Sequence, residues 1–318
     1  MLNYDDNNKT VPVIKEKSSS VRLKVTDKCN LSCIYCHNEG KANTDDIVWT
    51  SLTEGALRTL INALNLSEVH ITGGEPTCLN NIDDLVKNLT SLGLFVKITT
   101  NGQFTKAKLD SLADKGLGQL NFSVIALNPT DFIKTQNKKN LYWAQRCIER
   151  QKRIIYDARK MKAKIKLNTV VNNIQNICRV LTVYNFAKEK NIKIRLLNDL
   201  WSGQSAITAI NQILENELKA KKTGEKIVLG SSSKISYYED QDGFKFGVKE
   251  IIKNKLKSMC SNCEKSCIEE FYGIRLHKYR GRIFVMLCLT NLNEKTFLPL
   301  EDFIKSQQLE EISSICYN

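Results

Sequence analysis

Six apolar segments of strand length alternate with helical segments between residues 21 and 197, and this alternation constrains the fold most strongly. We predict strands at 21–25, 68–72, 95–99, 119–124, 164–170 and 193–197. Strands that alternate with helices pair in parallel, and right-handed crossovers curl such a sheet toward a barrel. The expected fold is therefore α/β, a partial (β/α)6 barrel similar to a TIM barrel.

Three cysteines follow the first predicted strand within eight residues, at Cys29, Cys33 and Cys36. Soft thiolates suit the irons of an iron–sulfur cluster, and a cubane held by three of them leaves one iron without a protein ligand. A structural zinc ion needs four ligands, and neither a histidine nor a fourth cysteine stands at zinc-finger spacing from the trio. Buried thiols are the other alternative, although these cysteines follow a loop-like segment and not an apolar run. We interpret the trio as cluster ligands.

A second cysteine group lies near the C-terminus and consists of Cys260, Cys263, Cys267 and Cys288. Four thiolates can close a structural zinc site, or they can hold a second [4Fe–4S] cluster. The spacing of the four residues leaves both interpretations open.

The chain carries 47 lysines and arginines against 34 aspartates and glutamates, which gives a net charge of +13. Such an excess is typical of proteins that bind anions, among which we favour a small substrate over nucleic acid, and solvated surface lysines are the alternative. No apolar run reaches the length of a membrane helix, and the N-terminus has no signal pattern. With eleven cysteines, an odd number, we expect a cytoplasmic protein that uses cysteines as metal ligands.

The cysteine trio, the Gly73–Pro76 segment and the Thr99–Gly102 segment together resemble the radical S-adenosylmethionine enzymes. The resemblance implies that the trio is catalytic and holds a [4Fe–4S] cluster whose open iron binds S-adenosylmethionine. One electron, from a donor such as flavodoxin or ferredoxin, would then cleave the cofactor to a 5′-deoxyadenosyl radical. The same resemblance implies that the Gly73–Pro76 segment grips the methionyl amine and that a tyrosine lies beside the adenine. The implied cofactor-binding residues are Tyr35, Gly73, Gly74, Glu75, Pro76, Thr100 and Ser123.

Within these enzymes, most of the chain resembles the GTP 3′,8-cyclases of molybdenum cofactor biosynthesis. This resemblance implies substrate-binding roles for Arg22, Lys166 and Arg275, and it favours a second, auxiliary [4Fe–4S] cluster at the C-terminal cysteines. The chain departs from that family at His70, where the family has an arginine, and at Cys267, which is an additional cysteine. We therefore expect a paralogue.

The expected domains are a flexible N-terminal segment (1–20), a radical S-adenosylmethionine core barrel (21–205) and a C-terminal auxiliary-cluster domain (206–318). The leading hypothesis is an enzyme that abstracts hydrogen from a small anionic substrate, such as a nucleotide or sugar nucleotide. The alternatives are GTP cyclisation itself, modification of a peptide, and a non-enzymatic iron–sulfur redox sensor.

Overall fold

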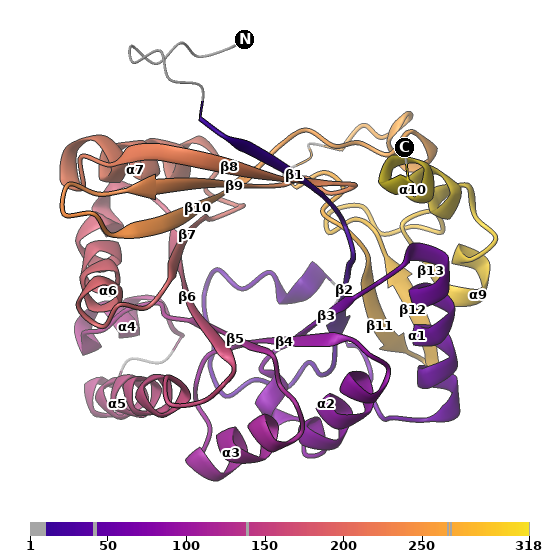
Figure 1. The fold of residues 1–318 in the computed structure, drawn as a ribbon, viewed down its shortest axis with the longest axis horizontal. Helices are drawn as coiled ribbons and strands as arrows, with labels where there is room; N and C mark the ends of the chain where they lie inside the picture. The colour runs from indigo at the N-terminus through magenta and orange to yellow at the C-terminus, as the bar shows by residue number, and fades with distance from the viewer. Residues whose placement is uncertain (1–10, 41–42, 138–139, 266, 268, 318) are drawn as a thin grey trace.

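The computed structural model describes residues 11–40, 43–137, 140–265, 267 and 269–317, and its strands form one mixed sheet (Figure 1). In chain order the strands are β1 (Val13–Lys17), β2 (Ser20–Lys24), β3 (Glu68–Thr72), β4 (Phe95–Thr100), β5 (Gln119–Ser123), β6 (Lys164–Val171), β7 (Ile194–Asn198), β8 (Lys221–Leu229), β9 (Ser233–Glu239), β10 (Lys245–Ile251), β11 (Arg275–Tyr279), β12 (Arg282–Met286) and β13 (Phe297–Pro299). The order across the sheet is β1-β8-β9-β10-β7-β6-β5-β4-β3-β2-β11-β12-β13. Strands β2 to β7 run in parallel and match the predicted segments to within one residue, which confirms the predicted α/β barrel.

A second set of strands continues the sheet beyond β7 and encircles the centre of the molecule (Figure 1). Strand β10 pairs in parallel with β7, β9 is antiparallel to both β10 and β8, and β1 is parallel to β8. The chain then passes from β1 through residues 18–19 directly into β2. The sheet is therefore continuous across the expected domain boundary at 205/206. Residues 13–17, expected within a flexible segment, form a strand, and residues 1–10 lie outside the described residues.

The C-terminal part of the chain extends the other edge of the sheet. Strand β11 pairs in parallel with β2, and β12 and β13 follow as antiparallel neighbours. This pairing places the start of β11 beside the strand that carries the cysteine trio at its end.

Helices cover the outside of the barrel (Figure 1). They are α1 (Ser51–Leu64), α2 (Ile82–Ser91), α3 (Lys106–Asp114), α4 (Pro129–Lys134), α5 (Leu141–Ala158), α6 (Ile177–Glu189), α7 (Gln204–Gln212), α8 (Lys257–Cys260), α9 (Leu300–Phe303) and α10 (Gln307–Tyr317). Side-chain oxygens of Thr50, Thr105, Asn128 and Asn140 accept backbone N–H bonds and begin helices α1, α3, α4 and α5. Among the described residues, no helix combines the length and the apolar character that a membrane crossing requires.

The two faces of the barrel strands differ in chemistry. Outward-facing side chains such as Ile71, Ile98 and Phe122 are fully buried in the core beneath the helices. The alternate, inward-facing positions carry polar or charged side chains, for example His70 and Arg195, which line a cavity. Because side chains alternate along a strand, the sheet separates an apolar core from a polar interior, and that interior holds the candidate site.

Candidate active site

A cavity of about 310 Å³, the central cavity, lies among the carboxyl ends of β2 to β7 and is bordered by β10 and by residues 269–275. Parallel barrels collect the loops that follow their strands at this end. The cavity brings together most of the residues selected from the sequence: Arg22, Cys29, Cys33, Tyr35, Cys36, Gly73, Gly74, Glu75, Thr100, Ser123 and Arg275. Pro76 and Lys166 do not line it. Pro76 is buried at the start of a short helical turn, and Lys166 lies on β6 two residues before Asn168, which does line the cavity.

The three N-terminal cysteines share one electrostatic environment in the loop after β2. Burial raises the pKa of the Cys29 thiol to about 11, with smaller contributions from Glu75 and from the other two thiols. Burial also raises the pKa of Cys33, which lies near the thiol of Cys36. Thiolates that repel one another are stabilised by bound cations, so this donor set fits the irons of a cluster.

Hydrogen-bond donors contact two sulfur atoms of this trio, those of Cys29 and Cys33. The amide of Leu31 and the side chain of Asn101 donate to Cys29 Sγ at 3.4 Å and 3.9 Å. The side chain of Gln136 donates to Cys33 Sγ at 3.3 Å. Donors of this kind orient metal ligands and tune the metal. Gln136 is missed by motif reasoning because it comes from the segment after α4, far from the trio in sequence.

The Gly73–Pro76 segment supports the cysteine loop. The amide of Gly74 donates to the carbonyl oxygen of Thr26 at 2.7 Å, and a β-carbon on Gly73 would lie 2.6 Å from the same oxygen. The glycines therefore permit close contact with the backbone of the cysteine loop, because any larger residue would collide with it. This contact is a structural role that the sequence analysis, which considered only the cofactor, did not include.

The carboxylate of Glu75 is buried and ties the end of β3 to the end of β4. Its oxygens accept from the hydroxyls of Thr77 (2.7 Å) and Thr100 (2.8 Å) and from the amide of Asn101 (2.6 Å). Burial raises the pKa of Glu75, although these donors oppose the shift. Thr100 therefore contacts Glu75 directly, and both residues line the central cavity together with the trio.

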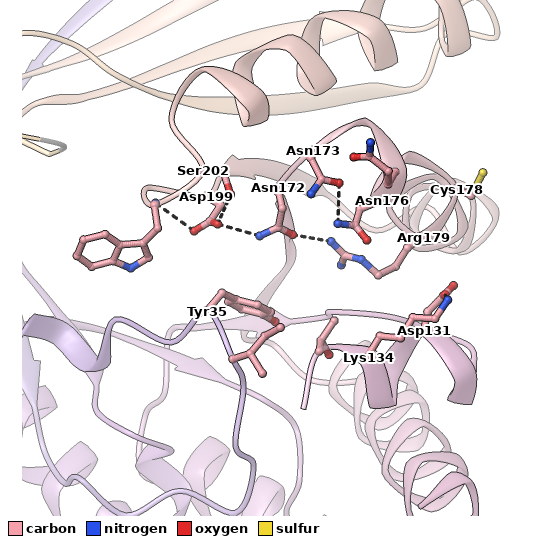
Figure 2. Close-up of a pocket in the computed structure, with 14 residues that line it drawn as sticks. Tyr35, Asp131, Lys134, Asn172, Asn173, Asn176, Cys178, Arg179, Asp199 and Ser202 are labelled. Atoms are coloured by element: carbon pink, nitrogen blue, oxygen red, sulfur yellow. Dashed lines mark hydrogen bonds and ion pairs between the residues drawn. The ribbon is translucent and has the colours of Figure 1, made fainter. Parts of the chain in front are cut away.

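Tyr35 lies between the central cavity and a second cavity of about 450 Å³, the lateral cavity, shown in Figure 2. In its wall, Asp199 accepts from Asn172 (2.9 Å) and from Ser202 (2.6 Å), and Arg179 donates to Asn172 at 3.0 Å. The Tyr35 hydroxyl is buried and lies within interaction range of the Cys33 thiol. Burial raises the pKa of Tyr35 well above its usual value, so the hydroxyl stays protonated and can donate to a ligand.

Arg22 and Arg275 reach the central cavity already paired with carboxylates. Arg22 binds both oxygens of Glu39, and Arg275 donates to Glu39 at 3.2 Å and to Glu269 at 2.8 Å. Burial would raise the pKa of Glu39, but the two arginines help to hold it well below the usual range. Two arginines and two glutamates balance in charge, so this group as a whole presents no net positive charge to a ligand. One donor, Arg275 Nη1, is buried without a partner among the described atoms.

Other cations of the barrel interior have no carboxylate partner among the described residues, and these are Lys166, Arg195 and Lys249. Arg195 and Lys249 line the central cavity. Burial lowers the pKa of Lys166 to about 7, and neighbouring cations, Arg195 first among them, add to the shift. Tyr272 packs against Lys249, whose Nζ lies 3.9 Å from the ring centroid. Burial opposes ionisation of Tyr272, yet the nearby cations lower its pKa to about 8.

Sequence reasoning missed Arg195, Lys249 and Tyr272. Arg195 faces inward on a predicted strand, so the alternation of side chains along that strand could have found it. Lys249 and Tyr272 follow no motif, because they reach the cavity from β10 and from the segment before β11.

The four C-terminal cysteines line one small cavity of about 30 Å³. Burial raises the pKa of the Cys260 thiol, and the thiols of Cys267, Cys288 and Cys263 add to the shift, so all four lie within electrostatic reach. Asn291 donates to Cys263 Sγ at 3.5 Å. Among the described residues, no three Cys, His, Asp or Glu side chains are grouped closely enough to hold a single metal ion. The features that favour a cluster here are the four thiol donors and the cavity that they share.

A family model described as the Radical SAM superfamily matches residues 23–187, which is 165 of the 318 residues. The chain belongs to this superfamily and is an enzyme, and its cofactors include S-adenosylmethionine and a [4Fe–4S] cluster. The GTP 3′,8-cyclase of Nautilia profundicola is 29% identical over 260 residues, which cover 79% of this chain and 78% of that one. The GTP 3′,8-cyclase of Clostridium perfringens strain 13 is 28% identical over 286 residues, 80% of this chain and 82% of that one. The resemblance to that family is confirmed.

Solved structures share the fold. SuiB of Streptococcus suis, bound to S-adenosylmethionine, has a TM-score of 0.57 at 16% identity and covers 93% of this chain. The chain spans 65% of SuiB, which is less than two thirds of its length. Native anSMEcpe with bound AdoMet has a TM-score of 0.58 at 14% identity, covering 96% of this chain and 84% of that one. Both confirm the α/β barrel.

Proposed function

We propose that this radical S-adenosylmethionine enzyme abstracts a hydrogen atom from a small anionic substrate, with nucleotides and sugar nucleotides as the favoured class. The observation that carries the proposal is the lining of the central cavity, which combines three thiols with Arg195 and Lys249. Burying a cation without a carboxylate partner costs free energy, so cations kept in a cavity favour an anionic ligand. The curated relatives are named for GTP, which belongs to the same class.

Cys29, Cys33 and Cys36 are the proposed ligands of the first cluster. When bound, that cluster supplies the electron that cleaves S-adenosylmethionine into methionine and a 5′-deoxyadenosyl radical. The protein holds the three sulfurs in one loop, and its amide donors orient two of them. The proposed cofactor contacts are Tyr35, Gly73, Gly74, Glu75, Pro76, Thr100 and Ser123.

The adenine end of the cofactor is proposed to lie beside Tyr35, whose ring lines both cavities. The proposed substrate contacts are Arg22, Lys166 and Arg275, together with Arg195 and Lys249. Lys166 lies deeper in the barrel than the cavity lining, so a substrate must extend inward to reach it.

A second [4Fe–4S] cluster is proposed at Cys260, Cys263, Cys267 and Cys288. Support comes from the shared cavity of the four thiols and from their mutual effect on the pKa of Cys260. With all four thiolates bound to iron, no iron stays open, so this cluster would relay electrons or stabilise the domain.

GTP cyclisation is the second candidate, because the relatives with that name are 28–29% identical over most of the chain. The environment of His70 argues against GTP cyclisation. Burial lowers the pKa of His70 far below its usual value, with Arg22 as the next cause, so the imidazole is neutral where the cyclase resemblance implies an arginine. His70 is bonded to Thr99 at 2.6 Å and lies 3.3 Å from the amide of Asn121. The barrel interior thus has one cation fewer for a triphosphate.

The test is anaerobic reconstitution with iron and sulfide, followed by dithionite and S-adenosylmethionine, with 5′-deoxyadenosine measured by chromatography. An electron donor such as flavodoxin or ferredoxin can replace dithionite. We expect 5′-deoxyadenosine to form faster when the correct nucleotide or sugar nucleotide is added. Arg195→Met should abolish that stimulation, whereas Arg159→Met, which changes an exposed arginine directly after α5, should preserve it. No 5′-deoxyadenosine under any condition would indicate the redox sensor instead. Conversion of GTP itself would establish the cyclase.

A further inference from the structure

One buried arginine connects the loops that carry the two cysteine groups. Arg275 begins β11, which pairs with β2, and its side chain is 2% exposed. Its Nε donates to Glu39 Oε2 at 3.2 Å, and its Nη2 donates to Glu269 Oε2 at 2.8 Å. Glu39 comes three residues after Cys36, and Glu269 comes two residues after Cys267. A single guanidinium therefore spans the two loops.

The bridge holds a strained segment. Glu39 has a φ of 50°, and its neighbours Asn38 and Gly40 have φ values of 45° and 78°. Non-glycine residues rarely adopt this region, and they stay there only when their surroundings fix them. The Glu39 carboxylate is fixed by Arg22 on one side and Arg275 on the other, so the conformation of the loop after Cys36 depends on both arginines.

We propose that Arg275 is a positioning residue that couples the two cysteine sites. A cluster bound by the C-terminal cysteines fixes the segment that contains Glu269, and Arg275 transmits that constraint through Glu39 to the loop of the first cluster. Loading of the second site then strengthens S-adenosylmethionine binding at the first. This inference rests on the second cluster put forward under Proposed function, and it gives Arg275 a role beyond substrate contact.

The test is a double-mutant cycle on S-adenosylmethionine affinity, with no substrate present. Affinity is followed through the change that the cofactor causes in the spectrum of the first cluster. In the parent, removing the second site by C260A/C263A should weaken binding by at least about fivefold, the lower range of typical coupling between sites. In an Arg275→Met background the same removal should change binding by no more than about twofold, which is the usual limit of additivity. Equal ratios in the two backgrounds would overturn the proposal.

Two controls separate coupling from other effects. A purely substrate-binding Arg275 would leave cofactor affinity unchanged, because no substrate is added. Arg282→Met removes an exposed arginine that pairs with Glu301 in the same region, and it should retain the full fivefold effect. Loss of the effect in Arg282→Met would contradict a specific role for Arg275.

Iron content distinguishes this proposal from the one on which it rests. If Arg275→Met fails to load the first site, Arg275→Lys and Glu269→Gln serve instead, because each keeps the side-chain size while breaking the double bridge. About eight irons in the parent together with equal affinity ratios would overturn the coupling alone. About four irons in the parent would overturn the second cluster and this inference with it.

Discussion

Replacing Gly74, which contacts the cysteine loop, tests whether backbone packing as well as the cofactor determines the shape of the first cluster site. A β-carbon at Gly74 would lie 2.6 Å from the carbonyl oxygen of Asp27 and 2.8 Å from the carbonyl carbon of Lys28, and still nearer to the oxygen of Lys28. Comfortable contacts between such atoms are roughly 3.5 Å, so the loop must move by about 1 Å. The colliding atoms belong to the backbone and cannot rotate away.

The change Gly74→Ala should destabilise the protein by about 1–3 kcal/mol, the usual cost of overpacking. Gly55→Ala is the matched control, because Gly55 is exposed in α1 and a β-carbon there would meet nothing within 4 Å. That control should stabilise the protein by about 0.5–1 kcal/mol, since alanine is the better helix residue.

Urea unfolding of the iron-free protein under anaerobic conditions measures both free energies, and iron analysis after reconstitution measures the site. We expect Gly74→Ala to lose stability and most of the iron of the first site, and Gly55→Ala to keep its iron. Parent-like stability and full iron content in Gly74→Ala would refute the steric reasoning.

Four further outcomes follow from the site. The reconstituted parent should bind about eight irons per chain, and Cys29→Ala about four with no 5′-deoxyadenosine, whereas four in the parent would argue against the second cluster. The affinity for the anionic substrate should rise as the pH falls from about 8 to about 6, because burial lowers the pKa of Lys166 to about 7 and protonation restores its charge. Calorimetry should show a flatter pH dependence of the affinity in Lys166→Met, and an unchanged slope in that variant would be inconsistent with a substrate-binding Lys166. A phenolate absorbance should titrate near pH 8 and vanish in Tyr272→Phe, and an unaltered titration in the variant would point to another tyrosine. The nearby cations outweigh burial and hold the pKa of Tyr272 below the unfolded value of about 10. The stability that this group contributes is therefore fully present above about pH 10 and is lost as pH falls through about 8. In a background without the first cluster, Cys267→Ala should open one iron of the second cluster to an added small ligand and change the spectrum of that cluster. If the second cluster of the parent protein already changes its spectrum when substrate is added, ligation by four thiolates is contradicted.

The positions of the barrel strands could be predicted from the sequence because a local pattern of residues repeats along the chain. Alternating strands and helices placed β2 to β7 to within one residue, because each strand carries apolar residues on its outward face and is bounded by a polar segment. The cysteine trio follows one predicted strand and Ser123 lies at the end of another, and both line the central cavity because parallel strands deliver their carboxyl ends to one side of a barrel.

Features that depend on long-range pairing were not predicted. Strand β1 has five exposed residues and becomes a strand only through β8, which lies more than 200 positions later. The ion pairs of Glu39 have the same origin, since its partner Arg275 belongs to β11. No local propensity encodes such contacts, because they exist only after the sheet has formed.

The carboxylates that neutralise Arg22 and Arg275 also determine where a substrate charge is best accommodated. With Glu39 and Glu269 beside these arginines, the positive charge left for a ligand lies at Arg195 and Lys249 in the cavity lining and at Lys166 deeper on β6. The thiols of the first site lie in the loop after β2, on a different part of the cavity wall. A substrate whose anionic group contacts these cations, and whose reacting carbon faces the thiols of the first site, must carry its charge some distance from that carbon. Nucleotides and sugar nucleotides meet this requirement, and a compact carboxylic acid does not, which is why we favour them.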